Sequence, residues 1–387
     1  MADKYYLYLS ENVRPGQTDP LPGISIYEMN RRTGEVSYLD KFPCRTNSNV
    51  SCVDNSRNLL YVTTEEVSEA ARRANGARIL TLKIDPATGH LTQLAETPTV
   101  SPNPAYITLD HAGEYAIVAN HTTHNFIYKI RRCADGTLKN ELVYDDATVN
   151  LYRLKDDGSV GDLVDVAIQE GSGPLKTQTH AHPHSAVLSP DGKLIAVCDK
   201  GADKVYMYHI DREHHRLVQA APPYCAAAGV EPRFCAFHPT HPFFYINHEG
   251  DLGVEAFSYD TEGNLTHLQT ISAVPENTPL CKGVVYEHQG IAIHPSGSFL
   301  YSVTRGVDGV AAFRIDTETG LLERMQHIAI TGQWPRCCQM SPDGNWLLAG
   351  CREGDNQLVV YRIGENGKLT EQQIIQNECG VSYISFF

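Results

Sequence analysis

A short pattern of alternating apolar and polar positions recurs along the chain and predicts strands. Each copy begins with alternating aromatic or aliphatic residues, continues through acidic or polar residues and a turn glycine, and resumes at Leu or Val. Because Gly, Asp and Asn accept the positive φ angle of a tight hairpin, each copy predicts a strand, a turn and a second strand. The seven copies span residues 26–36, 82–91, 151–160, 208–217 (which lacks the glycine), 257–265, 313–322 and 361–369.

A second marker, built from Pro, Asp or Gly, lies between these copies and precedes β-rich runs such as residues 299–303. Each repeat therefore contains two hairpins, which make a four-stranded antiparallel unit of about 55 residues, and seven such units in a ring make a β-propeller. A helical solenoid would need apolar residues three and four positions apart, and that spacing is missing. The markers stand at residues 110–113, 189–192, 238–240, 294–297 and 341–344.

The predicted fold is all-β: one seven-bladed β-propeller domain of four-stranded antiparallel blades over residues 1–387, with no linker dividing the ring. The step from Gly89 to Gly158 is longer than the others, so we expect an insertion near residues 126–147. Residues 65–76 are rich in Glu and then in Ala and Arg, and they predict either one short helix or a mobile loop.

Composition and charge exclude several classes of function. The chain has 32 Lys and Arg against 46 Asp and Glu, which gives a net charge of −14, and 42% of its residues are hydrophobic. Intrinsic disorder is excluded because enough apolar surface is available to form a core. Nucleic acids and anionic membranes attract basic surfaces, so neither is an expected partner of this acidic chain.

The compartment is predicted from the N-terminal sequence and the cysteines. The first residues lack a basic region followed by an apolar run, so no secretory signal is expected. No stretch approaches the ~18 consecutive apolar residues of a membrane span. The eleven cysteines are odd in number and scattered, which indicates reduced thiols in a cytoplasmic protein rather than a disulfide framework, and no cofactor is predicted.

Four segments bring ionisable residues to the ends of strands that we expect near the central channel. In the first, His180, His182 and His184 stand at alternate positions, a spacing that projects side chains to one side of an extended chain and suits Zn²⁺. Pro183 bends this run, and no Cys or carboxylate partner is evident. The prediction is therefore a single acid–base or hydrogen-bonding histidine without a metal, with purely structural histidines as the alternative.

The other three segments contain Arg233, Glu249 and Arg305. An Arg that follows Pro at the entry to an inner strand offers a fixed fork of donors to a carboxylate or an oxyanion, although Arg233 could instead form a salt bridge with Glu231. Glu249 ends an apolar strand, where the alternative is a solvated surface carboxylate. Arg305 occupies the matching place in a later blade. Because these positions are equivalent between blades, we expect the residues to meet at one mouth of the channel.

Over nearly the whole chain, the sequence resembles the lactonase family of seven-bladed propellers. This family includes bacterial 6-phosphogluconolactonases of the cycloisomerase type and the fungal 3-carboxy-cis,cis-muconate lactonising enzyme. Its channel mouth is lined by an Arg before a PheHisPro turn, a Glu closing the next strand, an Arg before Gly, and a His opening a strand. The matching residues here are Arg233, Glu249, Arg305 and His184.

The sequence departs from the family pattern around these residues. Phe234 and His248 stand where the family has His and Asn, Val303 and Thr304 replace Ser and Asn, and Lys200 replaces Leu. These substitutions surround the expected site, so the resemblance implies the class of reaction more firmly than the substrate.

The resemblance implies a metal-independent lactonase that opens a sugar-acid lactone similar to 6-phosphogluconolactone. Negative charge develops on the carbonyl oxygen in the transition state, so Arg233 and Arg305 are expected to stabilise it, or to clamp a substrate carboxylate or phosphate. Glu249 is the expected general base and His184 its partner, because an imidazole titrates near neutral pH. The expected substrate-binding residues are His182, Lys200, His248, Arg336 and His121.

Two alternatives remain beside this prediction. A cycloisomerase would use the same residues to close a muconate-type acid onto its own double bond, and it would consume a conjugated diene. A non-catalytic propeller would present loops to protein partners and would have no convergent charged cluster at the channel mouth. The partner expected for the enzyme is a small-molecule lactone or carboxylate, and the sequence carries no signature of oligomeric state.

Overall fold

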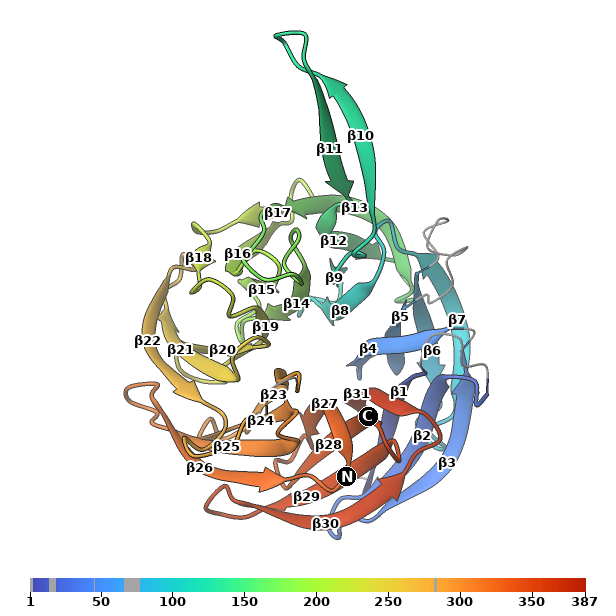
Figure 1. Ribbon diagram of the computed structural model, residues 1–387. Coiled ribbons are helices and arrows are strands. Elements are labelled where there is room, and N and C mark those ends of the chain that lie inside the picture. The colour runs from blue at the N-terminus through green and yellow to red at the C-terminus, as the bar shows by residue number, and fades with distance from the viewer. Residues whose placement is uncertain (1–2, 14–18, 45, 66–76, 282–283) are drawn as a thin grey trace.

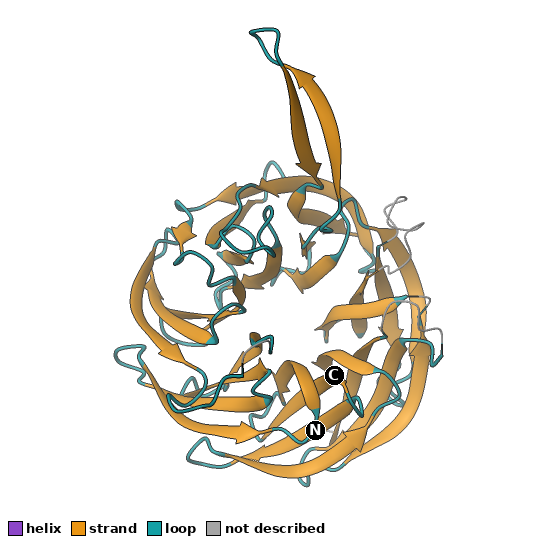
Figure 2. Cartoon of the chain, viewed as in Figure 1, coloured by secondary structure: helices purple, strands orange, loops and turns teal. Residues whose placement is uncertain are grey.

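Seven antiparallel sheets form a ring around a central channel, and the described residues contain no helix (Figures 1 and 2). The computed structural model describes residues 3–13, 19–44, 46–65, 77–281 and 284–387. Five sheets consist of consecutive strands, and a sixth is interrupted only by the hairpin β10–β11 between its second and third strands. The remaining sheet pairs the C-terminal strand with the three N-terminal strands and closes the ring. The predicted seven-bladed, all-β propeller is therefore confirmed.

Each blade has four main strands ordered from the channel outwards, and a short fifth strand, β18 (Tyr224–Cys225), pairs with β16 in the fourth blade. The first blade consists of β31 (Gly380–Phe386), β1 (Lys4–Asn12), β2 (Gly23–Asn30) and β3 (Val36–Pro43). The second consists of β4 (Asn47–Asp54), β5 (Leu59–Glu65), β6 (Arg78–Ile84) and β7 (Leu91–Pro98), and the third of β8 (Pro104–Leu109), β9 (Tyr115–Asn120), β12 (Ala147–Leu154) and β13 (Val160–Gln169). The fourth consists of β14 (Pro183–Leu188), β15 (Ile195–Asp199), β16 (Lys204–Asp211) and β17 (Arg216–Gln219), and the fifth of β19 (Pro232–Phe237), β20 (Phe243–His248), β21 (Gly253–Tyr259) and β22 (Leu265–Ser272). The sixth consists of β23 (Glu287–Ile293), β24 (Phe299–Arg305), β25 (Gly309–Ile315) and β26 (Leu322–Ala329), and the seventh of β27 (Gln333–Met340), β28 (Trp346–Glu353), β29 (Gln357–Ile363) and β30 (Leu369–Gln376).

The hydrophobic core lies between the facing sheets of neighbouring blades. At the boundary where the ring closes, Tyr5 and Leu7 of β1 belong to one apolar cluster with Trp346 and Leu348 of β28. The second and third strands of each blade are covered on both faces, so they are apolar along most of their length. This double burial explains the continuous β-rich runs that follow each second marker in the sequence.

The turn glycines of the repeated pattern are also contact points between blades. A tyrosine on the second strand of one blade donates a hydrogen bond to the carbonyl of the turn glycine in the next blade, as Tyr301 does to Gly367 at 2.8 Å. Gly367 has a φ of 76°, and a Cβ there would lie 2.3 Å from the ring of Phe299. The same bond joins Tyr8 to Gly89, Tyr61 to Gly158 and Tyr245 to Gly320.

The fourth blade, whose copy of the pattern lacks the glycine, keeps the contact in another form. His215 occupies the turn with a positive φ of 55°, and its Nδ1 is hydrogen-bonded to the hydroxyl of Tyr115 from the third blade. A histidine ring nitrogen therefore replaces the glycine carbonyl at this boundary.

The segment expected to be an insertion contains two strands that belong to no blade. β10 (Phe126–Arg132) and β11 (Leu138–Tyr144) form a separate two-stranded sheet between β9 and β12, and this hairpin projects away from the ring (Figure 1). Glu65 is the last residue of β5, and residues 66–76, for which a helix or a mobile loop was expected, lie outside the described residues. In the part of the chain that is described, no helix is long and apolar enough to cross a membrane.

Candidate active site

Residues from six of the seven blades line a charged cavity of about 190 Å³ where the innermost strands begin. Seven of the nine residues that the sequence singled out are among them. They are joined by two asparagines, an alanine and two further glutamates. The lining residues are Asn49, Glu65, Asn103, Ala105, His121, His184, Lys200, Arg233, Glu249, Glu287, Arg305 and Arg336.

A bulge at the same place in successive innermost strands presents side chains to this cavity. The pairing with the second strand skips His184 in β14, Arg233 in β19 and Arg336 in β27. A residue left unpaired by a bulge bends the strand and re-aims its side chain, and bulges are common next to active sites for this reason. The propeller therefore uses one repeated backbone irregularity to bring a histidine and two arginines to the same opening.

Three other charged residues stand at the ends of second strands. Lys200 follows β15, Glu249 follows β20, and Arg305 is the last residue of β24. In an antiparallel pair the end of the second strand lies beside the start of the first, so these side chains reach the same mouth as the bulged residues. The sequence suggested that these three residues lie on the innermost strands, but the strand pairing places them at the ends of the second strands.

Glu249 is the centre of the cluster. One of its carboxylate oxygens contacts the Lys200 ammonium and the other contacts a guanidinium nitrogen of Arg233. Glu249 is only 6% exposed, so it is not a solvated surface carboxylate, and Arg233 pairs with it rather than with Glu231. Glu231 instead accepts a hydrogen bond from Thr177.

A second ion pair lies on the next blade. Arg305 Nη1 is 2.6 Å from Glu287 Oε2, and its Nε donates to the carbonyl of Pro335 at 3.1 Å. Gln289 also donates to the Glu287 carboxylate, at 3.1 Å. Burial raises the pKa of Glu287, but Arg305 and Arg233 outweigh it and hold that pKa below its ordinary value.

Positive charges are concentrated in the cavity. Burial, followed by the charge of Arg233, lowers the pKa of Lys200 to about 8, although its ammonium contacts Glu249. Burial and then Arg336 lower the pKa of Arg305 to about 10. In addition, Arg233 Nε and Arg305 Nη2 are buried and have no hydrogen-bond partner among the described residues. Buried donors are normally satisfied, so these two favour a ligand with acceptor oxygens.

His184 is buried beside this cluster and is neutral at pH 7. Burial and the neighbouring Arg233 lower the pKa of its imidazole well below the ordinary value. We expected this histidine to titrate near neutral pH, and that expectation is wrong because the site is both buried and cationic. Its Nδ1 has no hydrogen-bond partner in the described part of the chain, so the neutral ring offers a free nitrogen for hydrogen bonding.

His121 lines the cavity, but His182 lies behind it. The two rings stack with centroids 4.6 Å apart, and His182 Nδ1 is 2.7 Å from the carbonyl of His121. His180 and His182 precede β14, so the alternating run is not part of a strand. In the chain as described, no group of three or more His, Cys, Asp or Glu side chains is arranged to hold a metal ion.

His248 does not line the cavity, although the sequence suggested that it binds substrate. Its Nδ1 is 2.9 Å from Asp251, and its Nε2 is 3.5 Å from Glu255 within the same blade. Burial lowers the pKa of His248, but the two carboxylates outweigh it and raise that pKa to about 9. His248 is therefore a charged structural residue of the fifth blade.

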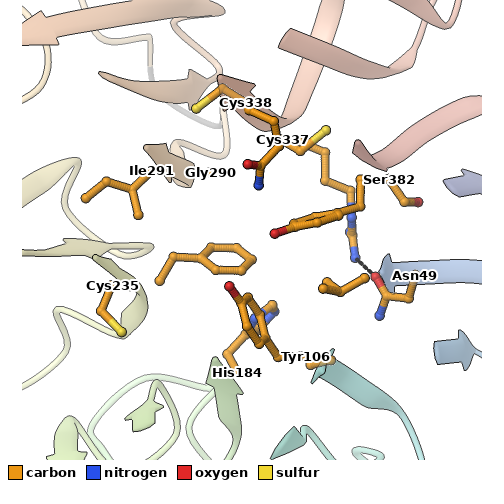
Figure 3. A pocket seen from close by; sticks show the side chains of 15 residues that line it. Asn49, Tyr106, His184, Cys235, Gly290, Ile291, Cys337, Cys338 and Ser382 are labelled. Carbon is orange, nitrogen blue, oxygen red and sulfur yellow. Dashed lines mark hydrogen bonds between the residues drawn. The ribbon is translucent and has the colours of Figure 1, made fainter. Parts of the chain in front are cut away.

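An apolar constriction adjoins the charged cavity along the channel (Figure 3). The rings of Tyr106, Phe234 and Tyr383 line a space of only about 30 Å³ there. His184 and Tyr106 point toward its centre, and the Phe234 ring lies 5.1 Å from the His184 ring. Phe234, which departs from the family pattern, thus supplies an apolar wall beside the proposed acid–base residues.

Sequence reasoning missed Glu287 and the polar residue Asn49, although both follow the repeat. Glu287 stands seven residues before His294 of a second marker, as Glu231 does before His238. Asn49 is the counterpart of Arg336 in another innermost strand, and Arg336 donates a hydrogen bond to it at 3.3 Å (Figure 3). Counting seven residues back from the marker at His294 identifies Glu287, whereas no marker follows Asn49 and only its place at the bulge of β4 reveals it.

The fold and the cavity together define a class of protein: a propeller that holds a buried carboxylate, a histidine and several cations at its channel mouth. A non-catalytic propeller was expected to lack such a convergent cluster, so that alternative is not supported. The family model described as “Lactonase, 7-bladed beta-propeller” matches residues 17–381, and the chain belongs to that family.

Individual relatives agree with this assignment. The chain is 27% identical to a 6-phosphogluconolactonase of Bacillus subtilis over 320 residues, which cover 81% of this chain and 82% of the relative. It is 26% identical to a 6-phosphogluconolactonase of Formosa agariphila over 379 residues, 96% and 97% of the two chains. The structure of a periplasmic gluconolactonase from Pseudomonas aeruginosa has the same fold, with a TM-score of 0.83, 24% identity and 99% coverage of both chains.

Proposed function

We propose that the protein hydrolyses the ester bond of a sugar-acid lactone to give the open hydroxy acid. The observation that carries this proposal is Glu249, a buried carboxylate held between Lys200 and Arg233 in the charged cavity. The proposal is supported by the relatives named 6-phosphogluconolactonase from Bacillus subtilis and Formosa agariphila. The reaction scheme uses only side chains of this chain.

In the first step, Glu249 accepts a proton from a water molecule as the water oxygen attacks the lactone carbonyl. The carboxylate is already fixed by two cations, so little reorganisation is needed when the proton moves. The neutral imidazole of His184 offers an acceptor to the second hydrogen of that water. The carbonyl oxygen gains negative charge, and the unpartnered guanidinium nitrogens of Arg233 and Arg305 are the donors that stabilise it.

In the second step, the tetrahedral intermediate collapses and the bond between the carbonyl carbon and the ring oxygen breaks. The leaving oxygen needs a proton, and Lys200 is the donor that we assign. Its lowered pKa of about 8 keeps it protonated at neutral pH while making the proton easier to release than that of an ordinary lysine. The proton held by Glu249 then returns to Lys200, which restores the starting state.

The substrate is expected to carry an anionic group in addition to the lactone. Arg233, Arg305 and Arg336 lie close together. Besides burial, the charges of Arg305 and Arg336 lower the pKa of Arg233, and the charge of Arg336 lowers the pKa of Arg305. An anionic group such as a phosphate relieves this repulsion, whereas a neutral sugar lactone does not. Arg336 is the least buried of the three, and its hydrogen bond to Asn49 is long at 3.3 Å, so we assign it to this anionic group.

Glu249→Gln tests the proposal. Lactone opening is followed by acid release in a pH-stat, with wild type and variant compared on phosphorylated and neutral aldonolactones. We expect kcat to fall by about 10²-fold or more, as is typical when a general base is removed. Glu255→Gln is the matched control, because Glu255 is equally buried at 5% exposure but lies outside the cavity, and its kcat should stay near wild type.

Three results would overturn the proposal. The first is an absence of lactone opening by the wild type above the spontaneous rate. The second is full activity in Glu249→Gln. The third is the loss of ultraviolet absorbance from a muconate-type diene without lactone opening, which would identify a cycloisomerase.

We also propose a cytoplasmic location, which is supported by eleven cysteines that are all free thiols.

A further inference from the structure

Strands β10 and β11 form an arm, defined here as residues 126–144, that has one apolar and one charged face. Side chains alternate between the two faces of a strand, and the antiparallel register decides which residues share a face. Phe126 lies opposite Tyr144 and Tyr128 opposite Leu142. The mainly apolar face therefore carries Phe126, Tyr128, Ile130, Leu138, Leu142 and Tyr144, together with Asn140 and, near the tip, Arg132. The other face carries Ile127, Lys129, Arg131, Lys139, Glu141 and Val143.

The apolar face is open to solvent. Ile130 is 75% exposed, Tyr128 64% and Leu138 61%, although residues of these types are normally covered. An isolated two-stranded hairpin is only marginally stable in water, and contiguous apolar surfaces larger than a few hundred Å² mark interaction sites. Neither β10 nor β11 pairs with any other described strand. The described residues of the single chain therefore leave the apolar face of the arm uncovered.

The base of the arm is fixed, so the exposed face has a defined orientation. Tyr144 stacks on His180 of the ring with centroids 4.4 Å apart, and Phe126 packs against Tyr144 at 6.0 Å. Next to this stack, the Thr123 hydroxyl donates a hydrogen bond to Asp145. No residue of the arm is among those lining the active-site cavity.

We propose that the partner is a second copy of this chain and that the arm of each copy docks by its apolar face on the ring of the other. Charge supports this choice. The arm carries four basic residues (Lys129, Arg131, Arg132 and Lys139) and two acidic ones, a net charge of +2. Because the whole chain has a net charge of −14, the rest of the chain carries −16. A cationic arm and an anionic ring attract each other, and two-fold symmetry provides this contact twice.

The available area fits such a dimer. Six apolar side chains, each presenting on the order of 100 Å², offer about 600 Å² per copy. Specific interfaces bury about 800 Å² per partner. In a two-fold dimer each copy buries its own arm and also the patch of ring that the other arm covers, so the area buried per copy exceeds this size. An anionic membrane would also attract the basic residues of the arm, and the test distinguishes it from a second copy.

The test compares two matched substitutions on opposite faces of the arm. Ile130→Ser changes the apolar face and Ile127→Ser changes the charged face, and both residues are exposed in β10. Sedimentation velocity across a wide concentration range gives the dissociation constant of the dimer. Circular dichroism and thermal unfolding confirm that each variant is folded. We expect the wild type to dimerise and Ile130→Ser to raise the dissociation constant by about tenfold or more, with little change in Ile127→Ser.

Several outcomes contradict the proposal. A wild type that remains monomeric at all concentrations excludes the second copy, and binding of that monomer to phosphatidylserine vesicles identifies a membrane instead. A dimer that is insensitive to Ile130→Ser places the interface elsewhere. Equal weakening by both substitutions refutes the assignment of the faces. Because the assay needs no substrate, failure here is distinguishable from failure of the proposed activity.

Discussion

Replacing Tyr301 by Phe removes one hydroxyl and tests whether the bond between blades stabilises the ring. The Tyr301 hydroxyl donates to the carbonyl of Gly367 at 2.8 Å, and the side chain is completely buried. Phe keeps the ring and its packing, so the main change is the loss of this hydrogen bond. The Gly367 carbonyl remains in place without its tyrosine donor.

The expected loss follows from the burial of both partners. A typical intramolecular hydrogen bond contributes about 1 kcal/mol net, and a buried acceptor left without its partner costs about 1–3 kcal/mol. We therefore expect Tyr301→Phe to lower the free energy of unfolding by about 1–2 kcal/mol. For a chain of 387 residues, with about 2 cal/mol/K of unfolding entropy per residue, this lowers the Tm by about 2 °C.

Urea unfolding followed by tryptophan fluorescence and circular dichroism measures this difference. Tyr38→Phe is the control, because Tyr38 is 57% exposed and lies on an outer strand. Tyr61→Phe should cost a similar amount at another blade boundary, and the double variant Tyr61→Phe/Tyr301→Phe should show additive losses because the sites are far apart. If Tyr301→Phe unfolds like the wild type, the hydroxyl makes no net contribution and the reasoning is refuted.

Three further predictions concern charge. In the proposed mechanism Lys200 donates a proton to the leaving oxygen, so kcat/KM should fall as the pH rises through about 8, and this decline should be absent from the residual activity of Lys200→Met. The raised pKa of His248, about 9, means that its charge stabilises the fold below about pH 6.5 and that this contribution is lost as the pH rises through 9. The difference in unfolding free energy between wild type and His248→Gln should therefore shrink by about 2 kcal/mol between about pH 6.5 and 9, a value that allows for the partial solvent exposure of Asp251. A difference that stays constant with pH would contradict a raised pKa of His248. Arg336→Gln should raise KM for a phosphorylated lactone by about tenfold while leaving that of a neutral lactone nearly unchanged, and equal effects on both would argue against a role in binding the anion.

The repeated pattern predicted the fold well because a propeller repeats one local unit. The turn glycines and the second markers lie where hairpins are needed, so their count gave the number of blades. The sequence did not reveal that β31 completes the blade of β1, because strand pairing between the two ends of the chain has no local signature. It also did not show that the same glycines receive hydrogen bonds from the neighbouring blade.

Individual site residues were predictable to different degrees. Arg233, His184 and Arg336 each stand five residues before a second marker, and this spacing places each at a bulge. His248 looked equivalent to its neighbour Glu249, but it is the last residue of β20 and faces Asp251 and Glu255, whereas Glu249 lies in the turn that follows and reaches the cavity.

The sequence by itself determined the repeat, the number of blades, the family and most of the charged residues at the channel mouth, because each depends on local spacing. The tertiary structure decided which charges pair. Lys200, Glu249 and Arg233 come from two blades and meet only when these neighbouring blades pack side by side. It also decided that His184 is neutral and that the arm presents an open apolar face, because burial and exposure depend on neighbours that are distant in the chain.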